Sequence, residues 1–388
     1  MHVYVLATLD TKGSEAEFVC HRLTELGVAT RLIDTSAEML KTGDRGSAVS
    51  QASVAVRAVV ATAFQRGEVA GVLALGGSAG TTIGTTAMQA LPIGVPKVMV
   101  STLASGQTRP YVGDSDIVMV NSVVDLAGIN RISRQILNAA AAAMAGMVKF
   151  RVAAAVHDKP LIAATMFGVT TPCVQHARQL LEEAGYEVLV FHATGNGGQA
   201  MEALIRGGLI TGVLDITTTE LADELVGGTL SAGPARLTAA AQCGVPQVVS
   251  VGALDMVNFG PMNTVPQRFR QRQFHRHNDN VTLMRTTPEE NALLGEEIAR
   301  KLALATGPST ILLPQQGVSA IDRAEQPFED SVARTALFDS IRRNLGGTTK
   351  CIQLDCHIND PAFAAQAART LLAMLPAIST NASPPRPS

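Results

Sequence analysis

Residues 71–82 read GVLALGGSAGTT, an apolar run that ends in a glycine-rich turn. The run has the length and composition of a buried strand, and the residues after the turn continue as a helix toward Ala90. A short apolar strand that leads into a helix is the unit from which parallel α/β sheets are built. The same alternation recurs along the chain, so this stretch decides the fold class.

The second half of the chain repeats the pattern of the first. Residues 212–216 (GVLDI) match residues 71–75 (GVLAL), and the Gly-Val-Pro segments at 94–96 and 244–246 each lead into an apolar run. Proline ends a helix and is tolerated at the first position of a strand. The repeat predicts two duplicated Rossmann-like, doubly wound lobes with mainly parallel sheets, whose first four strands superpose.

The two lobes are expected to span residues 1–150 and 155–375. A polar cluster, His157-Asp158-Lys159-Pro160, interrupts the apolar runs between them. The second lobe is longer, with two further strands and three further helices expected after residue 288. Residues 376–388 hold four prolines and few apolar side chains, which predicts a mobile tail.

Composition narrows the class of protein. With 31 basic and 33 acidic residues, the chain has no positive excess to neutralise a nucleic acid backbone. It has neither an uninterrupted apolar run of membrane-spanning length nor the basic start of a signal peptide. Its five cysteines form no C-x-x-C pair and are expected to be reduced thiols. We therefore expect a cytoplasmic protein that binds a small molecule, and neither nucleic acid nor membrane.

The glycine-rich turn predicts an anion site. Ligands of open α/β sheets bind outside the carboxyl ends of the strands, where a turn into a helix exposes backbone N–H groups and the positive end of the helix dipole. The turn is neither a P-loop nor a G-x-G-x-x-G fingerprint, so a tight turn that binds nothing is the alternative. The candidate cofactor-binding residues are Gly76, Gly77, Ser78, Gly80, Thr81 and Thr82.

Two neighbouring strand ends favour a phosphorylated ligand, because they add hydroxyl groups and one positive charge. Lys12 would offset phosphate charge, with a solvated surface lysine as the alternative. The added candidates are Asp10, Thr11 and Lys12 after the first strand, and Ser101, Thr102, Ser105 and Gly106 after the fourth.

The second lobe offers candidates for substrate binding and proton transfer. Buried acids near a ligand are candidate bases or magnesium ligands, although Glu220 equally suits the start of a helix. The His275-Arg276-His277 cluster lies in a basic stretch; two histidines without a third ligand do not define a metal site, and a solvated loop is the alternative. The substrate-binding candidates are Asn196, Gly197, Gly198, Glu220 and His277; the catalytic candidates are Lys12, Asp255 and His275.

Four stretches, residues 76–81, 98–106, 122–132 and 254–260, resemble one largely uncharacterised family. That family includes the ATP-binding N-terminal domain of the tomato mosaic virus resistance protein, and the resemblance covers about residues 1–375. It implies a two-lobed Rossmann-like protein that binds ATP and forms a homodimer or higher homo-oligomer. The plant protein carries a further barrel domain, so the resemblance also implies a separate TIM-barrel protein as partner.

Three residues depart from the family pattern, Ala79, Arg276 and Val251. Ala79 stands where glycine is commoner and narrows the turn. Arg276 adds charge beside the two histidines, so the role of that cluster stays open.

Together these features predict a cytoplasmic protein that binds ATP and Mg²⁺ on its first lobe. In the enzymatic hypothesis it is an ATP-dependent ligase or kinase acting on a small carboxylate or sugar acid between the lobes, with His275 or Asp255 moving protons. In the alternative it is a non-catalytic regulatory module, in which ATP stabilises a dimer that engages a partner protein.

Overall fold

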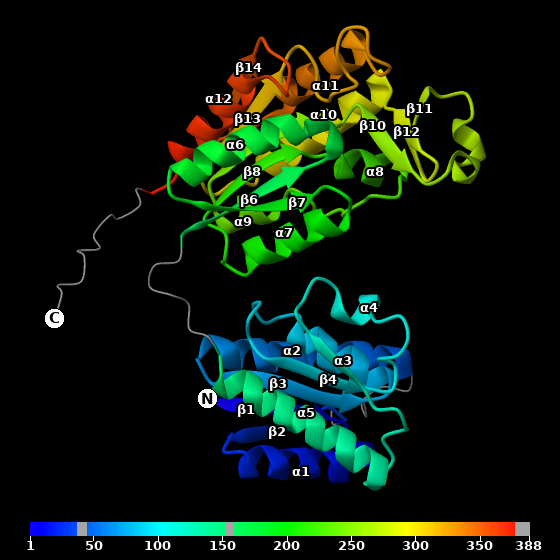
Figure 1. Cartoon of the computed structure of the whole chain (residues 1–388), viewed down its shortest axis with the longest axis vertical. Helices are drawn as coiled ribbons and strands as arrows, with labels where there is room; N and C mark the ends of the chain where they lie inside the picture. The colour runs from blue at the N-terminus through cyan, green and yellow to red at the C-terminus, as the bar shows by residue number, and fades with distance from the viewer. Residues whose placement is uncertain (37–44, 152–158, 377–388) are drawn as a thin grey trace, which may run out of the picture. The chain divides into compact units, whose positions relative to one another are not determined.

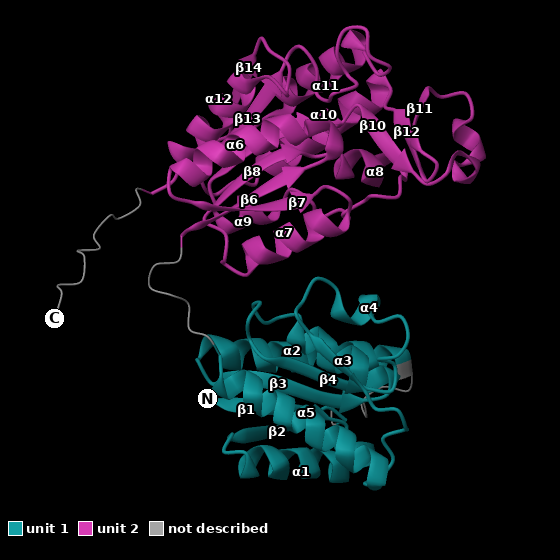
Figure 2. Ribbon diagram, viewed as in Figure 1, with its two compact units in different colours: residues 1–156 teal, residues 157–388 magenta. Residues whose placement is uncertain are grey.

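The chain folds into two compact units, Met1–Val156 and His157–Ser388 (Figure 2). The structure is a computed structural model that describes residues 1–36, 45–151 and 159–376. Each unit contains a parallel sheet with helices on both faces (Figure 1), which confirms the predicted α/β class with Rossmann-like lobes. The predicted tail after residue 376 and most of the predicted junction between the lobes lie outside the described residues.

Unit 1 is a five-stranded parallel sheet. Its strands are β1 (His2–Ala7), β2 (Thr30–Asp34), β3 (Val69–Gly76), β4 (Lys97–Ser101) and β5 (Val118–Asn121). Its helices are α1 (Leu9–Glu25), α2 (Arg45–Gln65), α3 (Ser78–Met88), α4 (Arg109–Val112) and α5 (Arg131–Lys149). The strand order is β2-β1-β3-β4-β5. Because side chains alternate along a strand, Val3 and Val5 pack with residues of α1 and α5, whereas Tyr4 and Leu6 pack with residues of α2 and α3.

Unit 2 repeats this arrangement in a six-stranded parallel sheet. Its strands are β6 (Leu161–Met166), β7 (Glu187–His192), β8 (Gly212–Thr217), β9 (Gln247–Gly252), β13 (Ser309–Pro314) and β14 (Lys350–Leu354). Its longer helices are α6 (Thr171–Glu183), α7 (Asn196–Arg206), α8 (Glu220–Val226), α10 (Pro288–Leu302), α11 (Ser331–Asn344) and α12 (Pro361–Leu372), and α9 (Ala239–Cys243) is short. The order β7-β6-β8-β9-β13-β14 places its first four strands as β2-β1-β3-β4 are placed in unit 1.

A small antiparallel sheet in unit 2 was not expected from the sequence. It consists of β10 (Met256–Phe259), β12 (Val281–Arg285) and β11 (Phe274–Asn278), in that order. The solvated loop given as the alternative for the His275-Arg276-His277 cluster is wrong in part, because these residues lie on β11 and His275 is half-buried. Met256 and Leu283 pack with Phe328 in a buried cluster, which supplies the apolar face that such short strands need.

Helix α2 is the one described helix that is long and apolar enough to cross a membrane, judged by length and composition alone. Its residues Ala52, Val56 and Val60 are buried in the same cluster as Tyr4 and Leu6 of β1. A core helix that covers a sheet passes the same test, so α2 is weak support for a membrane span.

Candidate functional site

The strand order of each unit defines one place where ligands of such sheets bind. In a sheet of order 2-1-3-4-5, the chain turns to the opposite side after its first strand, and a crevice forms at the carboxyl ends of the first and third strands. In unit 1 this switch point lies between β1 and β3, and in unit 2 between β6 and β8. The two switch points are built very differently.

In unit 1 the switch point is an open turn from β3 into α3, here called the nest. Gly77 is the N-cap of α3, and the first helical hydrogen bond runs from the N–H of Thr81 to the carbonyl of Gly77, at 2.8 Å. No hydrogen bond among the described residues uses the N–H groups of Ser78, Ala79 or Gly80. Three free donors at the positive end of an eleven-residue helix suit an anion.

The glycines of this turn have different roles. A Cβ on Gly76 would lie 2.6 Å from the Cα of Gly80, so the turn itself requires glycine there. A Cβ on Gly77 would meet only the hydroxyl oxygen of Thr102, at 3.7 Å. Packing therefore does not require glycine at position 77, and the missing side chain leaves room beside the free N–H groups.

Several predicted cofactor residues fix the shape of the nest. The hydroxyls of Thr81 and Ser101 lie 2.6 Å apart, and that of Ser101 accepts the N–H of Leu103 at 2.9 Å. Thr82 donates to the carbonyl of Ser78 at 3.0 Å. These contacts join the end of β4 to the first turn of α3.

Asp10, Thr11 and Lys12 form the first turn of helix α1 and not a loop after β1, and their role in cofactor binding stays a prediction. The N–H of Lys12 bonds to the carbonyl of Thr8 at 2.8 Å, and helix α1 therefore begins at Leu9. Lys12 itself has non-helical backbone angles, φ −130° and ψ 18°, and kinks the helix. Its half-buried side chain forms no ion pair with any residue that the structure describes.

A polar cavity of about 370 Å³ lies at the ends of β4 and β5. It is lined by Thr102, Ser105, Asn121, Ser122, Val123, Val124 and Asp125. Thr102 and Ser105 were predicted from the sequence, whereas Asn121 and Asp125 were not. Val123 has φ +61°, and the N–H of Val124 bonds to the carbonyl of Ser122 at 2.6 Å across it. A β-branched residue in the left-handed region is strained, and such strain clusters at functional sites.

In unit 2 the equivalent switch point is closed by the protein's own side chains. The repeat aligns Gly76-Gly77-Ser78-Ala79 with Thr217-Thr218-Thr219-Glu220, because residues 71–75 match residues 212–216. The hydroxyls of Thr217 and Thr170 lie 2.8 Å apart, and Thr218 donates to the carbonyl of Ser250 at 3.0 Å. All three threonines of residues 217–219 have 0% exposed surface, so the carboxyl end of β8 is buried.

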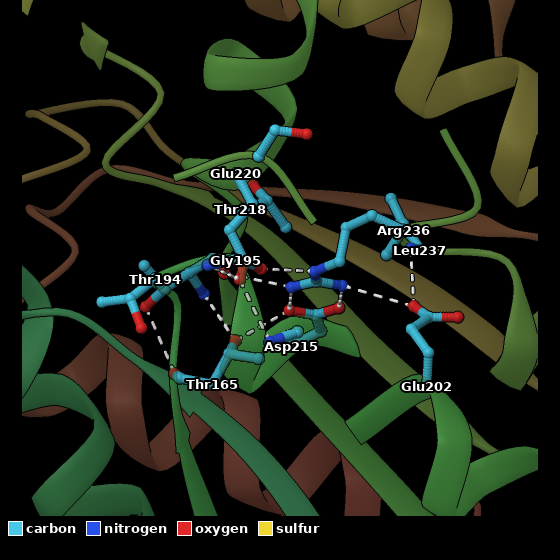
Figure 3. A network of polar contacts seen from close by, with 12 residues as sticks. Thr165, Thr194, Gly195, Glu202, Asp215, Thr218, Glu220, Arg236 and Leu237 are labelled. Carbon is cyan, nitrogen blue, oxygen red and sulfur yellow. Dashed lines mark hydrogen bonds and ion pairs between the residues drawn. The ribbon is translucent and has the colours of Figure 1, made fainter. Parts of the chain in front are cut away.

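The turn at residues 195–198, which contains the predicted substrate-binding residues Asn196, Gly197 and Gly198, is filled by the carboxylate of Glu220 (Figure 3). One carboxylate oxygen accepts the N–H groups of Gly195, at 2.7 Å, and Gly198, at 3.1 Å. A Cβ on Gly198 would lie 2.3 Å from the other carboxylate oxygen, so glycine is required there by packing. Asn196 is the first residue of α7, and a Cβ on Gly197 would strike the carbonyl oxygen of His192. Substrate binding by these residues stays a prediction.

Arg236 binds this carboxylate, and the sequence alone did not predict its role. Its Nε donates to Glu220 at 2.6 Å, and its two terminal nitrogens donate to Asp215 at 2.5 and 2.7 Å. Glu202 lies 3.6 Å away on another side. Burial alone would lower the pKa of Arg236, but the charges of Asp215 and Glu220 hold it well above its ordinary value. A signal existed in the repeat, because Asp215 stands where the first half has Ala74 and a buried acid needs a partner.

The remaining catalytic candidates lie elsewhere in unit 2. Asp255 is 1% exposed, and its one bonded carboxylate oxygen accepts the hydroxyl of Ser319 at 2.8 Å. Burial and the nearby charge of Asp322 raise the pKa of Asp255 to about 7. His275 lies half-buried on β11, edge-on to the ring of Phe328, and His277 is exposed on the same strand. No group of three or more metal-ligating side chains occurs in the described parts of the chain.

Comparison with known proteins identifies the family. The model of the uncharacterised protein family UPF0261 matches with its N-terminal domain at residues 35–153 and its C-terminal domain at residues 159–375. A UPF0261 protein of Clostridium tetani is 46% identical over 96% of this chain and 98% of its own length. A UPF0261 protein of Rhizobium meliloti is 47% identical over 93% of this chain and 96% of its own length.

A plant relative confirms the resemblance seen in the sequence. The ToMV resistance protein Tm-1(GCR237) of Solanum lycopersicum is 45% identical over 92% of this chain, but the match covers only 47% of the tomato protein. Both domains of the family model match this chain, and so do family members of nearly equal length. The chain belongs to the UPF0261 family.

Proposed function

We propose that unit 1 binds ATP, with the phosphates on the free N–H groups of Ser78, Ala79 and Gly80. The observation that carries this proposal is the contrast between the two switch points. The end of the third strand is open and lined by glycine in unit 1, whereas buried threonines close the equivalent strand end in unit 2. A strand end kept open where its duplicate is closed is the best candidate for a ligand.

The residues around the nest fit a polyphosphate. The ammonium group of Lys12 has no ion pair among the described residues, and β1 is the strand next to β3. Since no metal-ligating cluster occurs in the described residues, Mg²⁺ would arrive bound to the phosphates and keep most of its water. Five free cysteines suit the reducing cytoplasm, where we place the protein.

Calorimetry on the full chain tests the proposal. Gly77→Val places a side chain in the nest, and its Cβ would meet only the hydroxyl of Thr102, so the variant is expected to abolish ATP binding and to leave the fold intact. Gly146→Val on α5 is the matched control, because nothing lies within 4 Å of its added Cβ. Unchanged ATP affinity in Gly77→Val would place the phosphates elsewhere.

Two finer functions remain within this proposal. In the first, the protein is an ATP-dependent ligase or kinase that acts on a small carboxylate or sugar acid. In the second, it is a regulatory module that works with a separate TIM-barrel protein; the long unmatched part of the tomato relative favours this version. ADP release in the presence of a candidate substrate supports the enzyme, and ATP that stays intact on the protein supports the module.

A further inference from the structure

The cavity at the ends of β4 and β5 adjoins the nest through Thr102. Thr102 lines the cavity, and its hydroxyl oxygen lies 3.7 Å from the position of a Cβ on Gly77. The N–H of Thr102 also bonds to the carbonyl of Gly76, at 3.3 Å, which holds the two together. A ligand with phosphates on the nest can therefore extend its next chemical group into the cavity.

The lining of the cavity indicates what that group is. Asn121 accepts the N–H of Val123 with its side-chain oxygen, at 3.0 Å, so its amide NH₂ is left to donate. The carboxylate of Asp125 only accepts hydrogen bonds when ionised, and it lies exposed in the lining. No aromatic side chain lines the cavity. Donors and acceptors in this mixture suit hydroxyl groups, whereas a purine base would need an apolar slot and a further phosphate would be repelled by Asp125.

We propose that this cavity holds the ribose of the bound nucleotide, and that the carboxylate of Asp125 accepts hydrogen bonds from the ribose hydroxyls. The proposal rests on the ATP site proposed above. It assigns to Asp125 the recognition of the sugar, and it leaves the base to surfaces outside the cavity. Removal of either ribose hydroxyl should then weaken binding, whereas inorganic tripolyphosphate, which has no sugar, should lose no affinity when Asp125 is replaced.

The experiment compares four ligands on the full chain by calorimetry with Mg²⁺: ATP, 2′-deoxy-ATP, 3′-deoxy-ATP and tripolyphosphate. A hydrogen bond to a charged group predicts about tenfold weaker binding of each deoxy analogue to the parent. Asp125→Asn should bind ATP about tenfold more weakly and no longer distinguish it from the deoxy analogues. The same variant should bind tripolyphosphate at least as tightly as the parent, because it has lost a negative charge.

The opposite signs of these effects separate sugar recognition from simple charge repulsion. If Asp125→Asn tightens both ATP and tripolyphosphate, or if the parent binds all three nucleotides equally, the ribose assignment is overturned while the phosphate nest stands. If the parent binds neither ATP nor tripolyphosphate, the proposed function itself fails. Glu17→Gln removes an exposed acid on α1 and should leave all four affinities unchanged.

Discussion

The carboxylate of Glu220 lies 2.6 Å from the Nε of Arg236, and both side chains have 0% exposed surface. Burial raises the pKa of Glu220, and the contact with Arg236 opposes that rise. Asp215 also holds Arg236 in place, because it accepts hydrogen bonds from the two terminal nitrogens of the same guanidinium. The repeat aligns Glu220 with Ala79 of unit 1, and the N–H groups that its carboxylate binds belong to the turn after β7.

Breaking this ion pair should destabilise unit 2. Arg236→Met leaves Asp215 and Glu220 buried without a counter-charge, so we expect a loss of about 3–5 kcal/mol in the free energy of unfolding, measured by urea titration. The control is Arg178→Gln, which breaks an exposed pair with Glu182 and should cost less than about 1 kcal/mol. Equal losses of unfolding free energy in the two variants would show that the buried ion pair stabilises the protein no more than an exposed one.

The buried acid Asp255 should make the stability of unit 2 depend on pH. Its pKa rises from 3.8 when unfolded to about 7 when folded, so the folded state binds the extra proton between these values. The contribution of Asp255 to the free energy of unfolding is therefore largest at low pH. It falls as the pH rises toward 7 and stays constant above that pH. Asp255→Asn has no carboxyl group to ionise. Its free energy of unfolding should therefore rise relative to that of the parent by a few kcal/mol between pH 5 and pH 8.

Urea titrations of parent and Asp255→Asn at pH 5, 6.5 and 8 measure this gain. Asp279→Asn, which changes an exposed acid, serves as control and should track the parent at every pH. A constant difference between Asp255→Asn and the parent would contradict the assignment.

Two adjacent glycines should differ in what a methyl group does to the fold. Gly76→Ala would place its Cβ 2.6 Å from Gly80, so we expect a loss of about 1–3 kcal/mol in the absence of ligand. Gly77→Ala has ordinary contacts only, and it should unfold at the parent's temperature. Thermal unfolding of both variants measures the difference, and a reversed ranking would refute the geometry of the turn.

Lys12 should contribute to ligand affinity through its charge. Lys12→Gln is expected to weaken ATP binding about tenfold at low salt, and Lys12→Arg should recover part of that loss. The difference from the parent should shrink as salt is added, because exposed charges are screened. Lys350→Gln, on an exposed residue of β14, should have no effect on ATP affinity by calorimetry.

Much of the architecture could be predicted because it follows from local patterns. Apolar runs before glycine-rich turns mark the strands, and parallel sheets buried on both faces need such runs. The antiparallel sheet escaped prediction because β10 has only four residues and its partner β12 begins at Val281, after a long intervening segment. Pairings of that range leave no periodic signal in the sequence.

The candidate site divides in the same way. The glycine-rich turn could be predicted because its three glycines lie within five residues of the chain. The ion network could not, since Arg236 meets acids 16 and 21 residues away, and only the folded sheet brings them together. Asp125 was not predicted as a site residue for a similar reason. Only the parallel pairing of β4 and β5 brings it into the same cavity lining as Thr102.

Glu220 belongs to the same chain as the nest that it fills, and this has a consequence for how the two units respond to their surroundings. A tethered anion cannot diffuse away, so unit 2 holds its own at an effective concentration that the fold sets. An open nest must collect its anion from solution, and the resulting stabilisation grows with the ratio of free ligand to Kd. Two units with one strand order thus differ in kind. The second holds its anion whatever the solution contains, whereas on the ATP site proposed above the first would gain stability as the concentration of free ATP rises.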